Sequence, residues 1–105
     1  MVVTIFRSRL KPQALEEYGQ WASRIGEIAK TMPGYISHKG FTAPDGERVT
    51  IVEFETEEDV RAWASHSDHL LAKKKGRASF YSEYRIQVCT VFKQSEFKAA
   101  SESTQ

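Results

Sequence analysis

The fold is decided by one stretch of sequence, residues 32–56: MPGYISHKGFTAPDGERVTIVEFET. Pro33 cannot continue a helix and Gly34 permits the turn that follows, so this pair marks a helix end. Further along, Pro-Asp-Gly at 44–46 predicts a tight turn, because proline presets one backbone torsion and glycine accepts a positive one. The apolar residues on either side of that turn predict a β-hairpin over residues 35–55.

A helix is predicted on each side of this hairpin. In residues 12–32, apolar side chains recur at spacings of three and one, which draws a single stripe down an amphipathic helix. The second helix begins after Thr56, a favoured N-cap residue, and Ser67-Asp68 in its middle predicts a break or kink. Gly76 is predicted to end that helix. The stripe of the first helix consists of Ala14, Leu15, Tyr18, Trp21, Ala22, Ile25, Ile28, Ala29 and Met32.

Two further strands are predicted near the ends of the chain, at residues 2–10 and 80–92. The resulting β-α-β-β-α-β order is that of the α+β ferredoxin-like fold, in which two helices cover one face of a four-stranded antiparallel sheet. The strands at 48–55 and 80–92 carry apolar residues on both faces. Because soluble monomers rarely expose so large an apolar patch, we predict a homodimer in which two sheets face each other.

The length and composition of the chain are those of one globular domain. It has 105 residues, of which 40% are hydrophobic and 28% charged, and its formal net charge is +1. We predict a domain over residues 1–92 and a C-terminal tail over residues 93–105, with Phe97 anchoring the tail and a short helix from about Glu96. The small net charge does not indicate a nucleic-acid-binding protein, and the apolar stretches are too short to span a membrane.

The N-terminus lacks the charged start and cleavage site of a signal peptide, so we predict a cytoplasmic protein. Its single cysteine, Cys89, cannot form an internal disulfide and is interpreted as a structural thiol.

Candidate catalytic residues concentrate in the second helix. Trp63, His66 and His69 follow one another at intervals of three, so they can lie along one helical side if the break is mild. Histidine titrates near neutral pH and can take a proton from a phenol or enol. His69 is therefore the first candidate for a catalytic base and His66 the second. The alternative is that Trp63 belongs to the core and that the histidines cap the broken helix or face water.

A substrate pocket is predicted between the sheet and the helices, in contact with Trp63 and at least one histidine. Core packing is the alternative for each aromatic residue of this set. The predicted pocket residues are Trp21, Tyr35, His38, Phe41, Trp63 and Tyr84.

Other kinds of site find less support in the sequence. His66 and His69 lack the i, i+4 spacing of helical zinc ligands, and no third ligand converges on them, so we predict no metal site. The basic run at residues 73–77 is interpreted as the solvated end of a helix, because no aromatic or glycine-loop partner accompanies it. No glycine fingerprint for nucleotides is present.

Several short motifs together resemble the antibiotic biosynthesis monooxygenase (ABM) domain family, over roughly residues 2–92. The resemblance implies a dimeric α/β barrel, which agrees with the fold predicted above. The motifs are Met32-Pro33-Gly34-Tyr35, Pro44-Asp45-Gly46, Trp63-x-x-His66-x-x-His69-Leu70 and Gly76-Arg77-x-x-Phe80-Tyr81-x-x-Tyr84.

The resemblance also implies a chemistry. Members of this family that oxygenate polyketide-like phenols use no flavin, haem or metal, because the deprotonated substrate itself reduces dioxygen. Trp63 matches the family's helix tryptophan, as a pocket wall, and His69 matches the titratable position that follows it. The family's active-site asparagine has no counterpart, since the chain contains no asparagine; the first strand offers Thr4 and Arg7.

We therefore predict a cofactor-independent monooxygenase-like protein that acts on a small phenolic or quinol-type molecule. Its partners would be a small aromatic or apolar ligand and a second copy of itself. Two alternatives stay open: a proton-transfer isomerase of the same barrel superfamily, which would use the same histidines, and a non-catalytic small-molecule-binding module.

Overall fold

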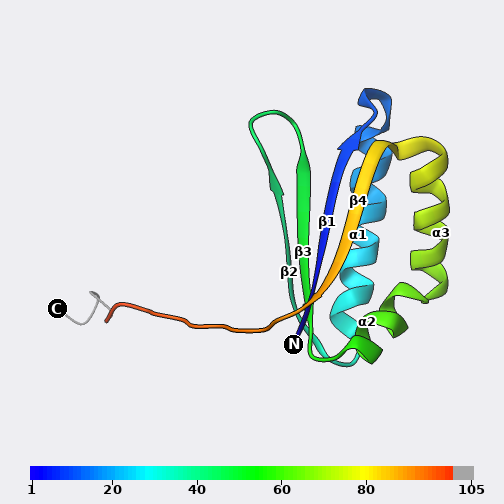
Figure 1. Ribbon diagram of the computed structural model, residues 1–105. Helices are drawn as coiled ribbons and strands as arrows, with labels where there is room; N and C mark the ends of the chain where they lie inside the picture. The colour runs from blue at the N-terminus through cyan, green and yellow to red at the C-terminus, as the bar shows by residue number, and fades with distance from the viewer. Residues whose placement is uncertain (101–105) are drawn as a thin grey trace.

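The computed structural model describes residues 1–100, which form a curved sheet and a layer of helices (Figure 1). A 3₁₀ turn at Pro12–Ala14 leads into the first helix, and a π-helical turn at Gly76–Phe80 leads out of the last. In chain order the elements are β1 (Val2–Leu10), α1 (Leu15–Thr31), β2 (Tyr35–Thr42), β3 (Arg48–Phe54), α2 (Glu57–Ala64), α3 (Ser67–Lys75) and β4 (Tyr81–Thr90).

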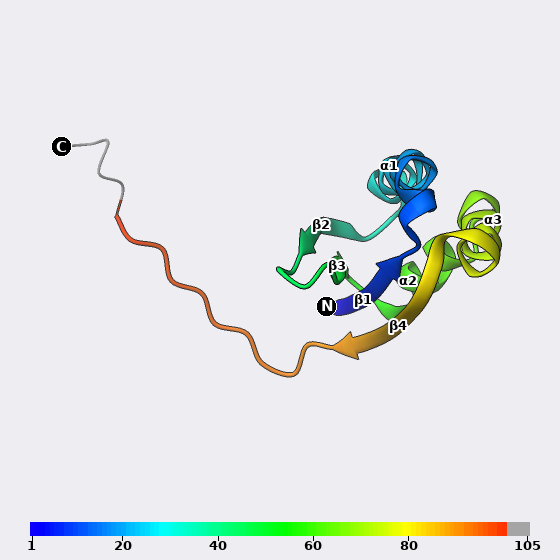
Figure 2. The same cartoon turned by 90° about the horizontal axis from the view of Figure 1, so that it is seen from above.

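The four strands pair antiparallel in the order β2-β3-β1-β4. The helices all lie on one side of this sheet (Figure 2). The predicted α+β ferredoxin-like fold is therefore confirmed. The hairpin strands β2 and β3 and the first and last strands, β1 and β4, all lie where the sequence predicted them.

The turn glycines have the torsions that the sequence pattern requires. Gly34 has φ of 79° and Gly46 has φ of 92°, both in the region that favours glycine. A Cβ atom at residue 34 would also collide with the Asp59 side chain at the start of α2. The end of α1 is thus packed directly against the next helix of the same layer.

The predicted break in the second helix is present, and a histidine forms its cap. The α2 helix ends at Ala64, and the Asp68 backbone N–H donates to the Nδ1 atom of His66 at 3.2 Å to begin α3. One of the two alternatives for His66, that it caps the broken helix, is what the geometry shows. The break lets α3 run in a new direction beside α1, to which it is tied by an Arg24–Asp68 ion pair at 3.3 Å.

The α3 helix ends at Lys75 with Gly76 as its C-cap, as predicted, but the chain does not leave the helical path there. The chain continues in a π-helical turn to Phe80, whose side chain is 2% exposed and whose carbonyl accepts from the Lys11 N–H at 2.8 Å. Gly76 is buried with helical torsions, and a Cβ there would press on the Tyr81 ring. Glycine is needed at this position for close packing and not for stopping the helix.

The core lies between the helices and the sheet and has two clusters. The larger is centred on Phe54, which is fully buried and packs with Trp63 of α2 and Ala29 of α1. The smaller joins Tyr18 to Phe80 in an edge-on contact with ring centroids 6.0 Å apart.

The opposite side of the sheet, which we call the outer face, has no helix over it (Figure 2). The strand register places Ile51 of β3 beside Ile5 of β1, with Val49, Val3 and Phe41 around them. These side chains are only partly buried, and Phe41 is 48% exposed. The outer face of the single chain therefore carries an apolar patch at its centre, bordered in the same register by Arg7, Lys39 and Glu53.

The C-terminal tail leaves the body of the protein (Figures 1 and 2). Residues 91–100 contain no helix, and Phe92 and Phe97 are 97% and 87% exposed. The prediction of a helix from about Glu96 was wrong, as was packing of Phe97 on its own body; docking on a second copy stays a prediction. Residues 101–105 of the predicted tail lie outside the described residues. Within residues 1–100, no helix has the length and apolar character needed to cross a membrane.

Candidate functional site

The junction of α2 and α3 brings together predicted site residues. The His69 ring stacks on Trp63 with centroids 4.4 Å apart and an angle of 46° between the planes. The His69 Nδ1 atom lies 3.2 Å from the backbone oxygen of Trp63. A carbonyl oxygen can only accept, so the hydrogen must sit on Nδ1, and the neutral ring then carries its free lone pair on Nε2. This is the tautomer that a proton acceptor requires.

Burial makes His69 a weak base. The pKa of His69 falls from 6.5 to about 4, mainly through loss of solvation and also through the charges of Lys73 and His66, while the hydrogen bond to the Trp63 carbonyl opposes the change. The ring is therefore neutral throughout the physiological range.

This pKa makes stability depend on pH. Between about pH 6.5 and pH 4 the unfolded chain takes up a proton at His69 that the folded chain refuses, so the free energy of unfolding falls on acidification. After allowance for partial solvent contact, we expect a loss of about 1–2 kcal/mol from this group between pH 7 and pH 5.

Urea unfolding at the two pH values measures this loss. The variant His69→Gln keeps an N–H donor for the Trp63 carbonyl but has nothing to titrate. It should lose about 1–2 kcal/mol less than the wild type on acidification. An equal loss in both proteins would mean that His69 titrates normally in the fold.

His38 and Tyr35 form a separate pair on β2. The Tyr35 hydroxyl lies 2.8 Å from His38 Nδ1, and the His38 ring lies against the backbone of Gly26 in α1. A Cβ at residue 26 would be 2.9 Å from His38 Nε2. Both His38 nitrogens thus face the α1–β2 contact, away from the α2–α3 junction.

The remaining predicted pocket residues are dispersed over the domain. Trp21 lies on α1 beneath the Arg24 guanidinium, 5.4 Å from the ring centre. Tyr84 belongs to an aromatic group with Phe6 and Tyr81, at 5.7 and 5.5 Å between centroids. Phe41 lies on the outer face of the sheet and cannot reach the layer between sheet and helices. Together with His66, which caps α3 at the same junction, Trp63 and His69 are therefore the predicted site residues that the structure gathers, and the others lie elsewhere in the domain.

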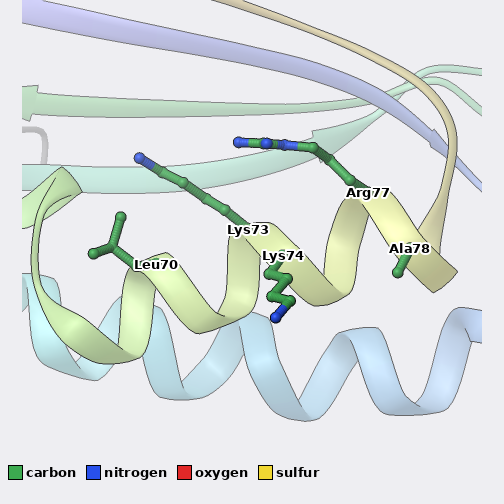
Figure 3. A pocket seen from close by; sticks show the side chains of 5 residues that line it. All are labelled: Leu70, Lys73, Lys74, Arg77 and Ala78. Carbon is green, nitrogen blue, oxygen red and sulfur yellow. The ribbon is translucent and has the colours of Figure 1, made fainter.

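A shallow, open cleft of about 510 Å³ runs along one face of α3 and the turn that follows it. Lys73 and Arg77 point from the helix toward the strands, whereas Lys74 points toward α1 (Figure 3). We call this the α3 cleft; its lining consists of Leu70, Lys73, Lys74, Arg77 and Ala78. The predicted cavity in contact with Trp63 and a histidine is not this one, because the lining begins one residue beyond His69.

Sequence reasoning missed Lys73 and Arg77, which it treated as part of a solvated helix end. Their i, i+4 spacing, with Leu70 three residues before, places all three on one helical face. The stretch from His69 to Ser82 also contains no acidic residue. The helical spacing of the two cations and the absence of nearby acidic residues in the sequence could have predicted a positively charged helix face here.

Three buried polar atoms lack a hydrogen-bond partner among the described residues. They are Trp63 Nε1, Thr4 Oγ1 and Ser8 Oγ. Thr4 and Ser8 lie on the helix side of β1, so all three lie between the helices and the sheet. Unpaired buried groups are destabilising and rare in native proteins, so each of the three needs a partner such as a water molecule or a ligand. Within residues 1–100, no group of three metal-ligating side chains comes together.

Comparison with known proteins gives consistent results. Residues 1–75 match the family model described as antibiotic biosynthesis monooxygenase. The uncharacterized protein YqjZ of Bacillus subtilis (strain 168) is 29% identical over 91 residues, which cover 87% of this chain and 80% of that protein.

Solved structures resemble the chain at low sequence identity. Rv0793 from Mycobacterium tuberculosis superposes with a TM-score of 0.80 at 14% identity, covering 90% of this chain and 98% of that one. SnoaB, a cofactor-independent oxygenase from Streptomyces nogalater, superposes with a TM-score of 0.74 at 17% identity, covering 89% and 94%. At these identities the structures establish the shared fold alone.

Proposed function

The chain belongs to the antibiotic biosynthesis monooxygenase family, and from this membership we propose that it is a cofactor-independent monooxygenase acting on a small phenolic or quinol-type molecule. SnoaB, a cofactor-independent oxygenase by its description, has the same fold. The observation that carries the proposal is His69, half-buried on Trp63 with Nε2 free to accept a proton.

The proposed reaction balances without an added reductant. A phenol with a free para position loses its hydroxyl proton to become a phenolate. The phenolate supplies all four electrons to dioxygen: one oxygen atom forms the new carbonyl of a quinone, and the other leaves as water. The protein's task is to hold the ring in an apolar layer and to manage the phenolic proton.

His69 alone is too weak a base for this step. Its pKa of about 4 lies about 6 units below that of a phenol, which opposes full proton transfer by on the order of 8 kcal/mol. An adjacent positive charge that stabilises the phenolate reduces this difference. Lys73 lies one helical turn beyond His69 on the same helix. We therefore assign His69 the role of proton acceptor and the nearby cations the role of stabilising the anion.

The function is tested by oxygen uptake with 1-naphthol under ¹⁸O₂, followed by mass spectrometry of the product. We expect uptake of one dioxygen per naphthoquinone formed and a single ¹⁸O atom in the quinone. A reaction no faster than that of the same solution without protein, across a panel of phenols and quinols, would contradict the proposal.

The same assay separates the two alternatives. A proton-transfer isomerase would change the substrate without consuming oxygen, and a binding module would bind it unchanged. The monooxygenase, the isomerase and the binding module would all bind the same ligand, so binding alone does not distinguish the three functions.

We also propose that the protein is a homodimer, joined through the outer face. An interface that covers Ile5, Ile51 and their apolar neighbours should bury on the order of 2,000 Å² in total. Sedimentation at micromolar concentration should give twice the chain mass of 12.0 kDa.

A charge in the centre of the outer face should abolish the dimer. We expect Ile51→Asp to sediment as a monomer, because a buried unpaired carboxylate opposes association. The matched control is Ala62→Asp, which adds the same charge on the exposed side of α2 and should stay dimeric. A wild-type protein that sediments only as a 12.0 kDa species would refute the proposal.

A further inference from the structure

The α3 cleft has an uncompensated positive charge. Lys73 and Arg77 project into the space between α3 and the strands (Figure 3), and among residues 1–100 neither forms an ion pair. The acidic residues that bracket this segment are engaged elsewhere: Asp68 with Arg24 at 3.3 Å, and Glu83 with Arg9 at 3.1 Å. A cleft whose walls carry one sign of charge attracts an anion.

The two cations also oppose each other. Burial lowers the pKa of Lys73, and the neighbouring Arg77 guanidinium lowers it further. An anion between them would relieve that repulsion. A guanidinium and an ammonium together suit an oxyanion, since guanidinium offers a planar pair of N–H donors and ammonium a mobile point charge.

Apolar groups lie on the strand side of the same layer. By register, Val88 and Ile86 of β4 lie beside Thr4 and Phe6 on the helix side of the sheet. Their exposed fractions are nevertheless 54% and 47%, because no helix covers β4 there. Leu70 adds a 52% exposed side chain from α3. Leu70 and Ala78 therefore give the cleft itself an apolar part, and Ile86 and Val88 add exposed apolar surface on the helix side of β4.

From this arrangement we propose that the α3 cleft binds the anionic oxygen of an aromatic or apolar ligand, held by Lys73 and Arg77. The ligand class is an aromatic carboxylate or a phenol acidic enough to bind as its anion. The inference deepens the proposed function, on which it rests for the identity of the ligand as substrate.

A purely structural role does not account for both cations. The Lys73 ammonium donates to the Ala64 carbonyl at 3.1 Å and so helps to cap α2, but this uses one of its three donors. Arg77 has no such bond among the described residues, and its position is exposed. Arg77 is therefore the better first target for mutation, because its removal leaves the helix ends intact.

The experiment compares 2-naphthoate with neutral 2-naphthamide by isothermal titration calorimetry. The two probes share ring and size and differ in charge. We expect Arg77→Met to weaken naphthoate binding about 10-fold or more and to leave naphthamide within about 2-fold, since hydrogen bonds to charged groups are the strong ones. Lys73→Met should act in the same direction, and Lys73→Arg should restore most of the affinity.

The matched control is Arg61→Met, which removes the same charge from an exposed position of α2 paired with Glu57. Equal weakening of naphthoate by Arg61→Met would show that only net charge matters and would overturn the site. So would an Arg77→Met variant that binds both probes as the wild type does, or a wild type that binds neither. Naphthoate binding without any oxygen uptake would instead refute the monooxygenase and leave the anion site standing.

Discussion

Replacement of His69 by glutamine should lower turnover of a phenolic substrate about 100-fold or more, the usual contribution of a positioned general base. Glutamine keeps the bulk and can still donate to the Trp63 carbonyl, but it has no lone-pair nitrogen to accept the proton. His69→Ala should lose a similar factor. Single-turnover rates under saturating oxygen measure the effect on the chemical step.

His38→Gln is the matched control for this substitution. His38 is also half-buried and hydrogen-bonded, but its nitrogens face Tyr35 and α1 instead of the α2–α3 junction. We expect the turnover of the His38→Gln variant to stay within about 3-fold of wild type, because His38 takes no part in the proton transfer. If His69→Gln retains most of the activity, the ring serves packing and the proton must leave by another route.

The pH profile gives an independent test of the same assignment. A base with a pKa of about 4 stays unprotonated as the pH falls from 8 to 5, so kcat/KM should be nearly flat in that range and should decline only below it. An ordinary histidine with a pKa near 6.5 would instead be about 97% protonated at pH 5. A roughly 30-fold fall by pH 5 would show that the essential base has an ordinary pKa, which contradicts a buried His69 with a lowered pKa as that base.

Much of the fold could be predicted because its signals are local. Pro33 and Gly34 end a helix, and Gly46 permits a turn, through torsions that belong to those residues alone. The break between α2 and α3 was also predictable, and a histidine cap was one of the alternatives, but the sequence did not say which histidine fills it. Histidine is an unusual N-cap residue, and His66 fills that position through the geometry of its own ring nitrogen.

The α3 cleft could not be predicted because it depends on distant packing. In the sequence, Lys73 and Arg77 have the pattern of a solvated helix end. Only the fold shows that the neighbouring part of the sheet, β4, has exposed side chains on its helix side. The π-helical turn has the same origin, since Phe80 is buried against Tyr18, far away in the sequence, and its carbonyl accepts from the Lys11 N–H. The exposed tail shows the converse case: Phe97 was predicted as an anchor from its residue type, but its side chain is 87% exposed within residues 1–100.

Truncation of Trp63 to alanine should cost about 3–5 kcal/mol of folding free energy, the range for large aromatic residues in cores. Trp63 is 7% exposed, and its ring centre lies 5.5 Å from that of the fully buried Phe54. The loss is a large share of the stability of a typical small domain. Urea unfolding of the variant measures it. A cost below about 1 kcal/mol would mean that Trp63 is a pocket wall with little part in the core.

The variant Trp63→Phe distinguishes the contribution of the aromatic ring to stability from that of the indole N–H group. The smaller ring loses packing, but the substitution also removes the Nε1 donor, which has no partner among the described residues. An unpaired buried donor is destabilising by about 1–3 kcal/mol, so the two effects should nearly cancel and leave stability within about 1 kcal/mol of wild type. Trp21→Phe, on α1 and partly exposed, is the control for loss of an indole that is not in the core.

The same variant links stability to binding. If a ligand oxygen accepts from Nε1, then Trp63→Phe should weaken naphthoate and naphthamide alike, because both carry a carbonyl-type oxygen, while Arg77→Met weakens only the anion. Equal stability with reduced affinity for both probes would place the indole N–H in the ligand site. Equal stability with unchanged affinity would leave Trp63 as a core residue whose ring supports His69 through their stacking contact.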